Sequence, residues 1–162
     1  MIVWLQVLKA AHIVSAAIIF GGGLAIAFFT WFGMRHALRS GSIEALRAVL
    51  RYTVTADACL TAPAVAFQAA SGVALMLVYR WPFDSPWAIA VGSLFVFAGA
   101  CWLPVLWMQV RLHREARKAP STVALPPSFH ALFRAWFVLG VLAFAAVIAI
   151  YWLMIAQPLV VA

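Results

Sequence analysis

The stretch WLQVLKAAHIVSAAIIFGGGLAIAFFTWFGM, Trp4 to Met34, is apolar almost throughout and long enough to cross a membrane. Lys9 and His12 interrupt it one helical turn apart, and the run Gly21-Gly22-Gly23 follows. At about 100° per residue, one helical face collects Leu5, Lys9, His12, Ala16, Ile19, Gly23, Ala27 and Thr30. A charge and an imidazole therefore share a stripe with side chains small enough for close approach by another helix or a flat cofactor.

The whole chain is too apolar for a soluble domain. Of its 162 residues, 67% are hydrophobic and only 9% are charged. Helices of about 20 apolar residues span a bilayer, and four such segments fit, at about 4–34, 52–79, 86–110 and 129–155. The first is too long for a removed signal peptide and lacks the basic start and the cleavage pattern. We expect an all-α, four-transmembrane-helix bundle that forms one integral membrane domain over residues 1–162.

Most basic residues fall in two connections. Residues 35–51 are expected to form an amphipathic connector at the membrane surface, with Ser42 as a helix cap, and residues 111–128 a solvated, Pro-rich loop. Together with the start of the fourth segment they hold nine of the eleven Lys and Arg: Arg35, Arg39, Arg47, Arg51, Arg111, Arg114, Arg117, Lys118 and Arg134. The positive-inside rule predicts both connections in the cytoplasm and both termini periplasmic. Topology thus accounts for the net charge of +7, and we expect no nucleic-acid partner.

The second segment carries a polar stripe. Thr61, Gln68, Ser71 and Tyr79 lie on one helical face, which we expect to face the stripe of the first segment inside the bundle. Gln68 either hydrogen-bonds between helices or lines a cavity with Ser71 and Tyr79. Cys59 and Cys101 each stand alone in an apolar segment, and we interpret them as buried free thiols.

Asp57 and Arg134 are charges inside apolar segments. Asp57 lies six residues past Arg51, roughly 9 Å into the membrane from the cytoplasmic edge, and Arg134 lies at a similar depth in the fourth segment. A central charge costs roughly 2.5–3.5 kcal/mol on insertion scales. We therefore expect a structural Asp57–Arg134 ion pair, with a proton or ion relay as the alternative.

Four stretches carry a family resemblance: KAAHIVSAAIIFGGG (9–23), TADACLTAPAVAFQAASG (55–72), AGACWLPVLWMQVR (98–111) and FHALFRAWFVLGVLAFAAVIAIYWLM (129–154). Through them nearly the whole chain resembles small bacterial predicted integral membrane proteins grouped as a domain of unknown function. This resemblance implies a multi-pass protein of the bacterial cytoplasmic (inner) membrane and implies no activity. The K-x-x-H followed by glycines also resembles the first helix of CopD-type and HemJ-type haem-binding membrane proteins.

The second resemblance implies that His12 is the metal ligand of a haem b, with Lys9 beside a propionate and room for the ring at Gly23. The cytoplasmic histidines His36, His113 and His130 lie about 30 Å away across the hydrocarbon core, too far to share the iron. The site would be five-coordinate, completed by Met76, or bis-histidine across a homodimer axis. The alternatives are a neutral His12 hydrogen-bonded between helices and a Lys9 that snorkels to the interface.

Three functions remain open from the sequence. The first is a haem-b protein in electron transfer or haem-linked oxidation, with a quinone or another redox partner in the bilayer. The second is a small transporter or ion relay that uses Asp57 and the polar stripe. The third is a structural membrane subunit without a cofactor. His36, His113 and His130 either form a second site or are ordinary interface histidines, and whether the protein is an enzyme is left open.

Overall fold

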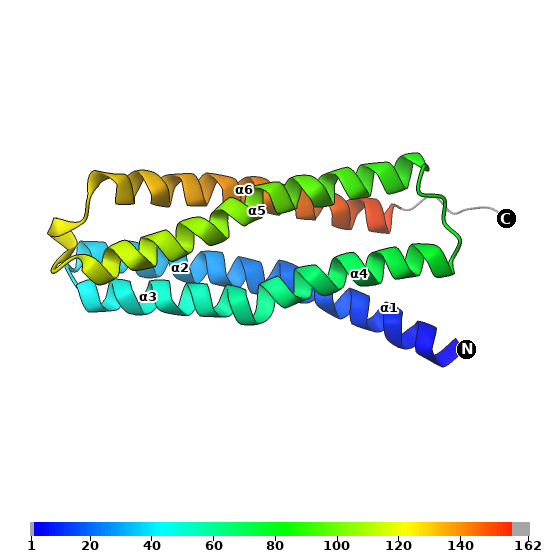
Figure 1. Cartoon of the computed structure of the whole chain (residues 1–162), viewed down its shortest axis with the longest axis horizontal. Helices are drawn as coiled ribbons and strands as arrows, with labels where there is room; N and C mark the ends of the chain where they lie inside the picture. Colours follow the sequence, from blue (N-terminus) through cyan, green and yellow to red (C-terminus); the bar gives the residue numbers. More distant parts are fainter. Residues whose placement is uncertain (1, 157–162) are drawn as a thin grey trace.

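The fold is an antiparallel bundle of four helical rods (Figure 1). The structure is a computed structural model that describes residues 2–156. Rod 1 comprises α1 (Ile2–Ala17), the π-helix η1 (Ile18–Gly22) and α2 (Gly23–Arg39), and rod 2 comprises α3 (Ile43–Ala56), the π-helix η2 (Asp57–Thr61) and α4 (Ala62–Val78). Rod 3 is α5 (Pro86–Lys118), rod 4 is α6 (Pro127–Ile155), and the short 3-10 helix η3 (Thr122–Ala124) lies between them. All four rods are long and apolar enough to cross a membrane, so the predicted fold class is confirmed.

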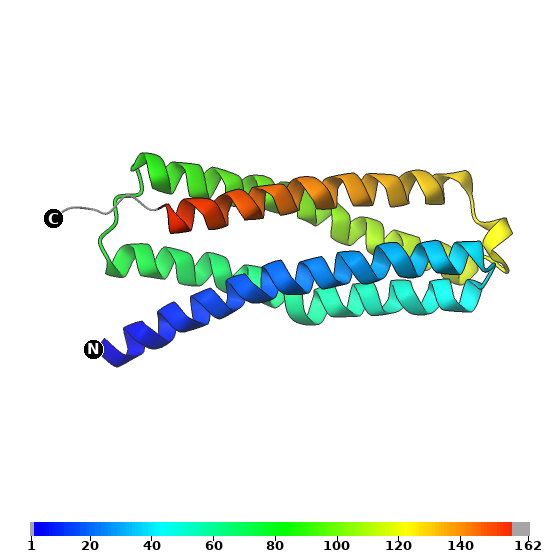
Figure 2. The same cartoon turned by 180° about the vertical axis from the view of Figure 1, so that it is seen from behind.

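Each rod packs against its neighbour in the chain. α1 contacts α4 and α2 contacts α3, while α5 contacts both α6 and α3. The start of α1 and the end of α6 lie at one end of the bundle, and the α2–α3 turn and the α5–α6 connection lie at the other, here called the connector end (Figure 1). From behind, rod 1 crosses rod 2 along its length (Figure 2).

The basic connections differ from the expectation, because the helices continue through most of them. α2 ends at Arg39 with Ser40 as its cap, and Gly41, the next residue, has a φ of 70° that suits glycine. The Ser42 amide donates to the Ala37 carbonyl at 3.0 Å, which closes a Schellman motif. The Ser42 hydroxyl then accepts from the Ala45 amide at 3.2 Å, which confirms the predicted cap. A tight turn therefore replaces the expected surface helix, and α5 likewise continues to Lys118.

The large apolar core lies in the connector half of the bundle. Its fully buried members come from four helices: Met34, Leu46, Leu50, Leu112 and Phe129. This explains why residues 43–51 have an amphipathic pattern, since their apolar face packs inside the protein rather than onto a membrane surface. In the other half, several of the buried residues are small, including Ser15, Ala64, Ser71 and Ala98. The bundle is therefore held by large side chains at the connector end and by close helix approach elsewhere.

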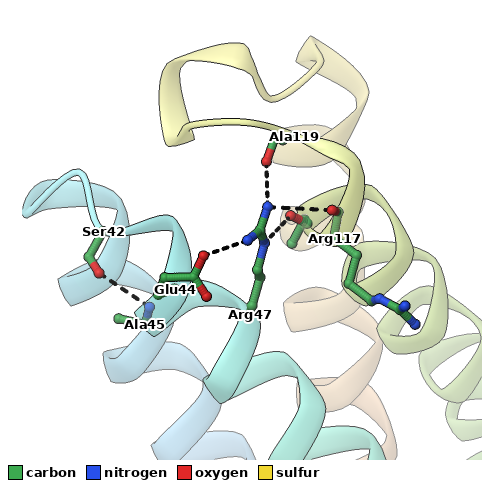
Figure 3. Close-up of polar contacts among 7 residues, drawn as sticks. Ser42, Glu44, Ala45, Arg47, Arg117 and Ala119 are labelled. Carbon is green, nitrogen blue, oxygen red and sulfur yellow. Dashed lines mark hydrogen bonds and ion pairs between the residues drawn. The ribbon is translucent and has the colours of Figure 1, made fainter.

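Arg47 joins α3 to the end of α5 (Figure 3). Its Nε donates to the Ala116 carbonyl at 3.0 Å, and one terminal nitrogen donates to the Ala119 carbonyl at 2.9 Å and more weakly to that of Arg117 at 3.4 Å. These carbonyls belong to the last turn of α5 and its cap, where a helix lacks internal donors. The other terminal nitrogen pairs with Glu44. We call this set of contacts the Arg47 bridge.

Gly33 sets the distance between α2 and α3. A Cβ at this position would lie 2.8 Å from Cγ2 of Val49. We expect Gly33→Ala to destabilise the protein by about 1–3 kcal/mol through overpacking, and Val49→Ala in the same chain to recover part of the loss. The measurement is unfolding in detergent. Gly140→Ala is the control, since nothing lies within 4 Å of its Cβ position, and an equal loss there would refute the steric explanation.

Candidate functional site

A cluster of four polar side chains joins α1 to α4 inside the bundle. His12 and Ser15 lie three residues apart on α1, and Gln68 and Ser71 three apart on α4, so each pair shares one helical face. His12 Nδ1 lies 2.7 Å from Ser71 Oγ, and His12 Nε2 lies 2.9 Å from Gln68 Nε2. The Ser15 hydroxyl donates to Gln68 Oε1. This histidine cluster confirms that the polar stripes of the first and second segments face each other.

The hydrogen bonds assign the protons of the histidine cluster. The Ser71 hydroxyl donates to the Phe67 carbonyl at 2.6 Å, so its oxygen accepts the Nδ1 proton of His12. Nε2 then has a free lone pair, which accepts a proton from the Gln68 amide. This network holds a neutral imidazole with both ring nitrogens in use. It matches the interhelical hydrogen-bonding alternative for His12.

A haem does not fit the histidine cluster as it stands. An iron at His12 would need one ring nitrogen, and each is already bonded to α4. The ring also packs on the α4 backbone, since a Cβ at Gly72 would lie 3.3 Å from His12 Cε1. The space expected at Gly23 is filled by Phe144 of α6, whose Cε2 lies 3.3 Å from where a Cβ of Gly23 would be.

The other residues expected around a haem have ordinary surroundings. Lys9 Nζ lies 4.6 Å from the ring centroid of Tyr79. Both side chains are exposed, in the half of the bundle opposite the connector end. This cation–π contact agrees with a lysine that snorkels toward the interface. Met76 is half-buried on α4, one turn beyond Gly72. Lys9 and Tyr79 thus extend the contact between the two polar stripes beyond His12.

A second polar cluster lies where η2 meets α5. Asp57 and Thr61 of η2 are both 4% exposed, and Gln109 of α5 is 3% exposed. Thr61 lies four residues after Asp57 on the same face of rod 2, and Gln109 lies near the Asp57 carboxyl. The Thr61 hydroxyl is a buried group with no hydrogen-bond partner within residues 2–156. We call Asp57, Thr61 and Gln109 the carboxyl cluster.

Each of the first two rods contains one π-helical turn. η2 ends just before Pro63, which lacks the amide that would bond to the Cys59 carbonyl. η1 spans Gly21 and Gly22, and η1 contacts η2 in the bundle. Single π-turns are rare and frequently occur at functional sites. The two π-turns contact each other, and η2 itself carries Asp57 and Thr61 of the carboxyl cluster, so this level of the bundle is a candidate functional level.

The expected Asp57–Arg134 ion pair is not formed in the structure. Within residues 2–156 the ion pairs are Arg47–Glu44 and Arg111–Glu115. Arg134 is exposed because the buried face of α6 carries Phe133 and Trp136. A residue next to Phe133 points about 100° away from that face. Similar depth along two helices did not bring the two charges together.

Other expected groupings are absent from the described part of the chain. No set of three or more His, Cys, Asp or Glu residues in it could hold a metal ion. His36 and His130 are exposed, whereas His113 is half-buried. Both cysteines are free as expected, but Cys59 is exposed on the rod surface and only Cys101 is buried.

Sequence reasoning missed two residues that build these sites. Ser15 lies one turn from His12, and Gln109 is a rare polar residue inside an apolar segment, so both carried a readable signal. Thr30 and Thr53, which the helical periodicity puts on the facing stripes of the first and second segments, form a separate contact. Their hydroxyls lie 2.6 Å apart and both residues are 1% exposed. Thr53 donates to the Val49 carbonyl at 2.9 Å, so Thr30 donates to Thr53.

Comparison with known proteins gives one match. No curated protein matches the chain. No solved structure matches it either. The profile of a family described as "predicted integral membrane protein (DUF2269)" matches residues 6–158, which is nearly the whole chain. The four membrane-length rods agree with that description. The chain belongs to this family of integral membrane proteins.

Proposed function

We propose that this protein carries protons, or a solute that moves with protons, across the membrane and that Asp57 is the group that binds the proton. The observation that carries this proposal is a carboxyl group 4% exposed within a membrane-length rod and without an ion pair in the described residues. A lasting charge there would cost roughly 2.5–3.5 kcal/mol. Ionisable residues inside membrane segments commonly belong to proton relays and transport pathways.

The surroundings of Asp57 support exchange of a proton. Gln109 offers both a donor and an acceptor, so it can bond to the charged and to the neutral carboxyl. The unpartnered Thr61 hydroxyl can donate when the carboxyl loses its proton. Asp57 and Gln68 are 11 positions apart on rod 2, roughly 16 Å along the axis. Transfer of a proton from Asp57 to the histidine cluster would therefore require water to enter the bundle near η1 and η2.

The haem function is not favoured by this geometry. A haem would need a free nitrogen on His12, and both ring nitrogens are hydrogen-bonded to α4. The arguments for a quinone or redox partner and for a bis-histidine homodimer depend on the haem, so they are not favoured either. The structural-subunit alternative explains the histidine cluster but not the carboxyl, because asparagine would bond between helices at a lower cost.

The orientation proposed for the membrane is the one that the positive-inside rule predicts. The connector end carries the basic residues, so it would face the cytoplasm of a bacterial inner membrane and both termini would be periplasmic. A reporter fused after Ala162 that is active only outside the cytoplasm would check this.

Proton flux in liposomes tests the proposal. Liposomes that contain the purified protein, a trapped pH-sensitive dye and a potassium diffusion potential should acidify faster than protein-free liposomes. Equal rates over a range of imposed potentials and pH gradients would count against transport. An absorption spectrum is recorded first, because a Soret band that disappears in His12→Ala would favour the haem alternative instead.

A further inference from the structure

We infer that the groove between α3 and α5 at the connector end binds the phosphate of an anionic phospholipid headgroup. The groove has a volume of about 360 Å³ and is lined by Glu44, Arg47, Ala48, Arg51, His113 and Arg117. It is separate from the histidine and carboxyl clusters and does not depend on the transport proposal.

Positive charge converges in this groove from two helices. Arg51 stands on α3, and His113 and Arg117 lie one turn apart on α5. Arg51 and Arg117 are the charged neighbours of His113. Three donors from two sides can therefore surround one phosphate, which guanidinium groups bind well.

Within residues 2–156, no acidic side chain forms an ion pair with Arg51 or Arg117, although Glu44 also lines the groove. The chain has four acidic residues, of which Asp57 is buried and Asp84 lies in the α4–α5 connection at the opposite end. Glu44 is paired with Arg47, and Glu115 with Arg111 at 3.1 Å. Arg47 is also committed to the carbonyls of α5. Arg51 and Arg117 are therefore available to an external anion.

The position of the groove favours a lipid over a soluble anion. Arg51 lies over the ring of Tyr52 at 4.9 Å and donates to its hydroxyl at 3.2 Å. Tyr52 is 55% exposed, and it is the first residue of the apolar segment that begins after the basic connector. Exposed tyrosines and arginines at the ends of membrane segments lie at headgroup depth. A basic site at that depth faces the anionic lipids of its own leaflet.

Lipid titration with matched charge variants tests this inference. Fluorescent phosphatidylglycerol is titrated into the detergent-solubilised full chain, with equally labelled phosphatidylcholine as the comparison. We expect preference for phosphatidylglycerol, and roughly thirtyfold weaker binding of it in Arg51→Gln/Arg117→Gln. Arg39→Gln/Arg114→Gln removes the same charge from the same end outside this groove and should leave the affinity unchanged.

Each other outcome would overturn the inference. Equal losses in the two double variants would indicate diffuse attraction, and equal binding of the two lipids would remove the phosphate argument. Displacement of phosphatidylglycerol by inorganic phosphate would assign the groove to a soluble anion. Should the groove double variant fail to fold, Arg117→Gln alone serves, with roughly fivefold weaker binding expected, since the bridge uses only the backbone carbonyl of Arg117.

Discussion

Replacing Asp57 with asparagine should reduce proton flux to the rate of protein-free liposomes. Asparagine has the same shape and can still bond to Gln109, but it cannot bind and release a proton at any accessible pH. We expect flux through the protein to fall at least tenfold while the fold is kept. Stability in detergent should stay the same or rise, because the variant no longer buries a group that can ionise.

Two further variants separate proton binding from structure. Asp57→Glu keeps the carboxyl on a longer stem and should retain part of the flux. Arg134→Gln tests the ion pair that the sequence suggested, and we expect little effect because Arg134 is exposed. If the two charges did pair, removing Arg134 would strand a buried carboxylate and cost about 3–5 kcal/mol. Full flux in Asp57→Asn would show that the carboxyl only joins helices.

The four membrane rods were predictable from the sequence because a bilayer demands about 20 apolar residues from each helix. The ends of the rods were not predictable in the same way. Leu46, Val49 and Leu50 make an amphipathic pattern that a membrane surface and a protein core satisfy equally well. Only the packing of α3 against α2 and α5 shows that this face is the core.

One part of the candidate site was likewise predictable from the sequence, and another part was not. The contact between His12 and the Gln68–Ser71 face followed from helical periodicity, which put the two polar stripes on faces that were expected to meet inside the bundle. The surroundings of Asp57 depend on which face of α5 or α6 meets η2, and depth along the chain cannot distinguish these. Gln109 rather than Arg134 is therefore its neighbour. The haem expectation had a similar weakness, because a histidine beside small residues fits a cofactor and a second helix alike.

Arg47→Ala should be strongly destabilising for a change at a partly exposed residue of the connector end. The guanidinium of Arg47, which stands on α3, donates to the carbonyls of Ala116 and Ala119 at 3.0 and 2.9 Å, and Figure 3 shows the side chain between Glu44 and Ala119. Hydrogen bonds to a charged group contribute more than neutral ones, so the loss of these contacts is expected to cost about 2–4 kcal/mol. Unfolding in detergent measures the loss, and hydrogen exchange should rise first in residues 116–125.

We expect the geometry of the fork, as well as its charge, to make this contact strong. Arg47→Lys keeps the charge but offers a single ammonium, which cannot direct donors along both carbonyl directions, so it should recover less than half of the loss. Glu44→Gln should cost about 0–1 kcal/mol, since the glutamate side chain is 77% exposed and such pairs contribute little. Arg114→Ala removes an exposed arginine from the same end of α5 and should change stability by less than about 0.5 kcal/mol. A full rescue by lysine would instead assign the effect of Arg47 to charge alone, acting on the negative end of the α5 dipole.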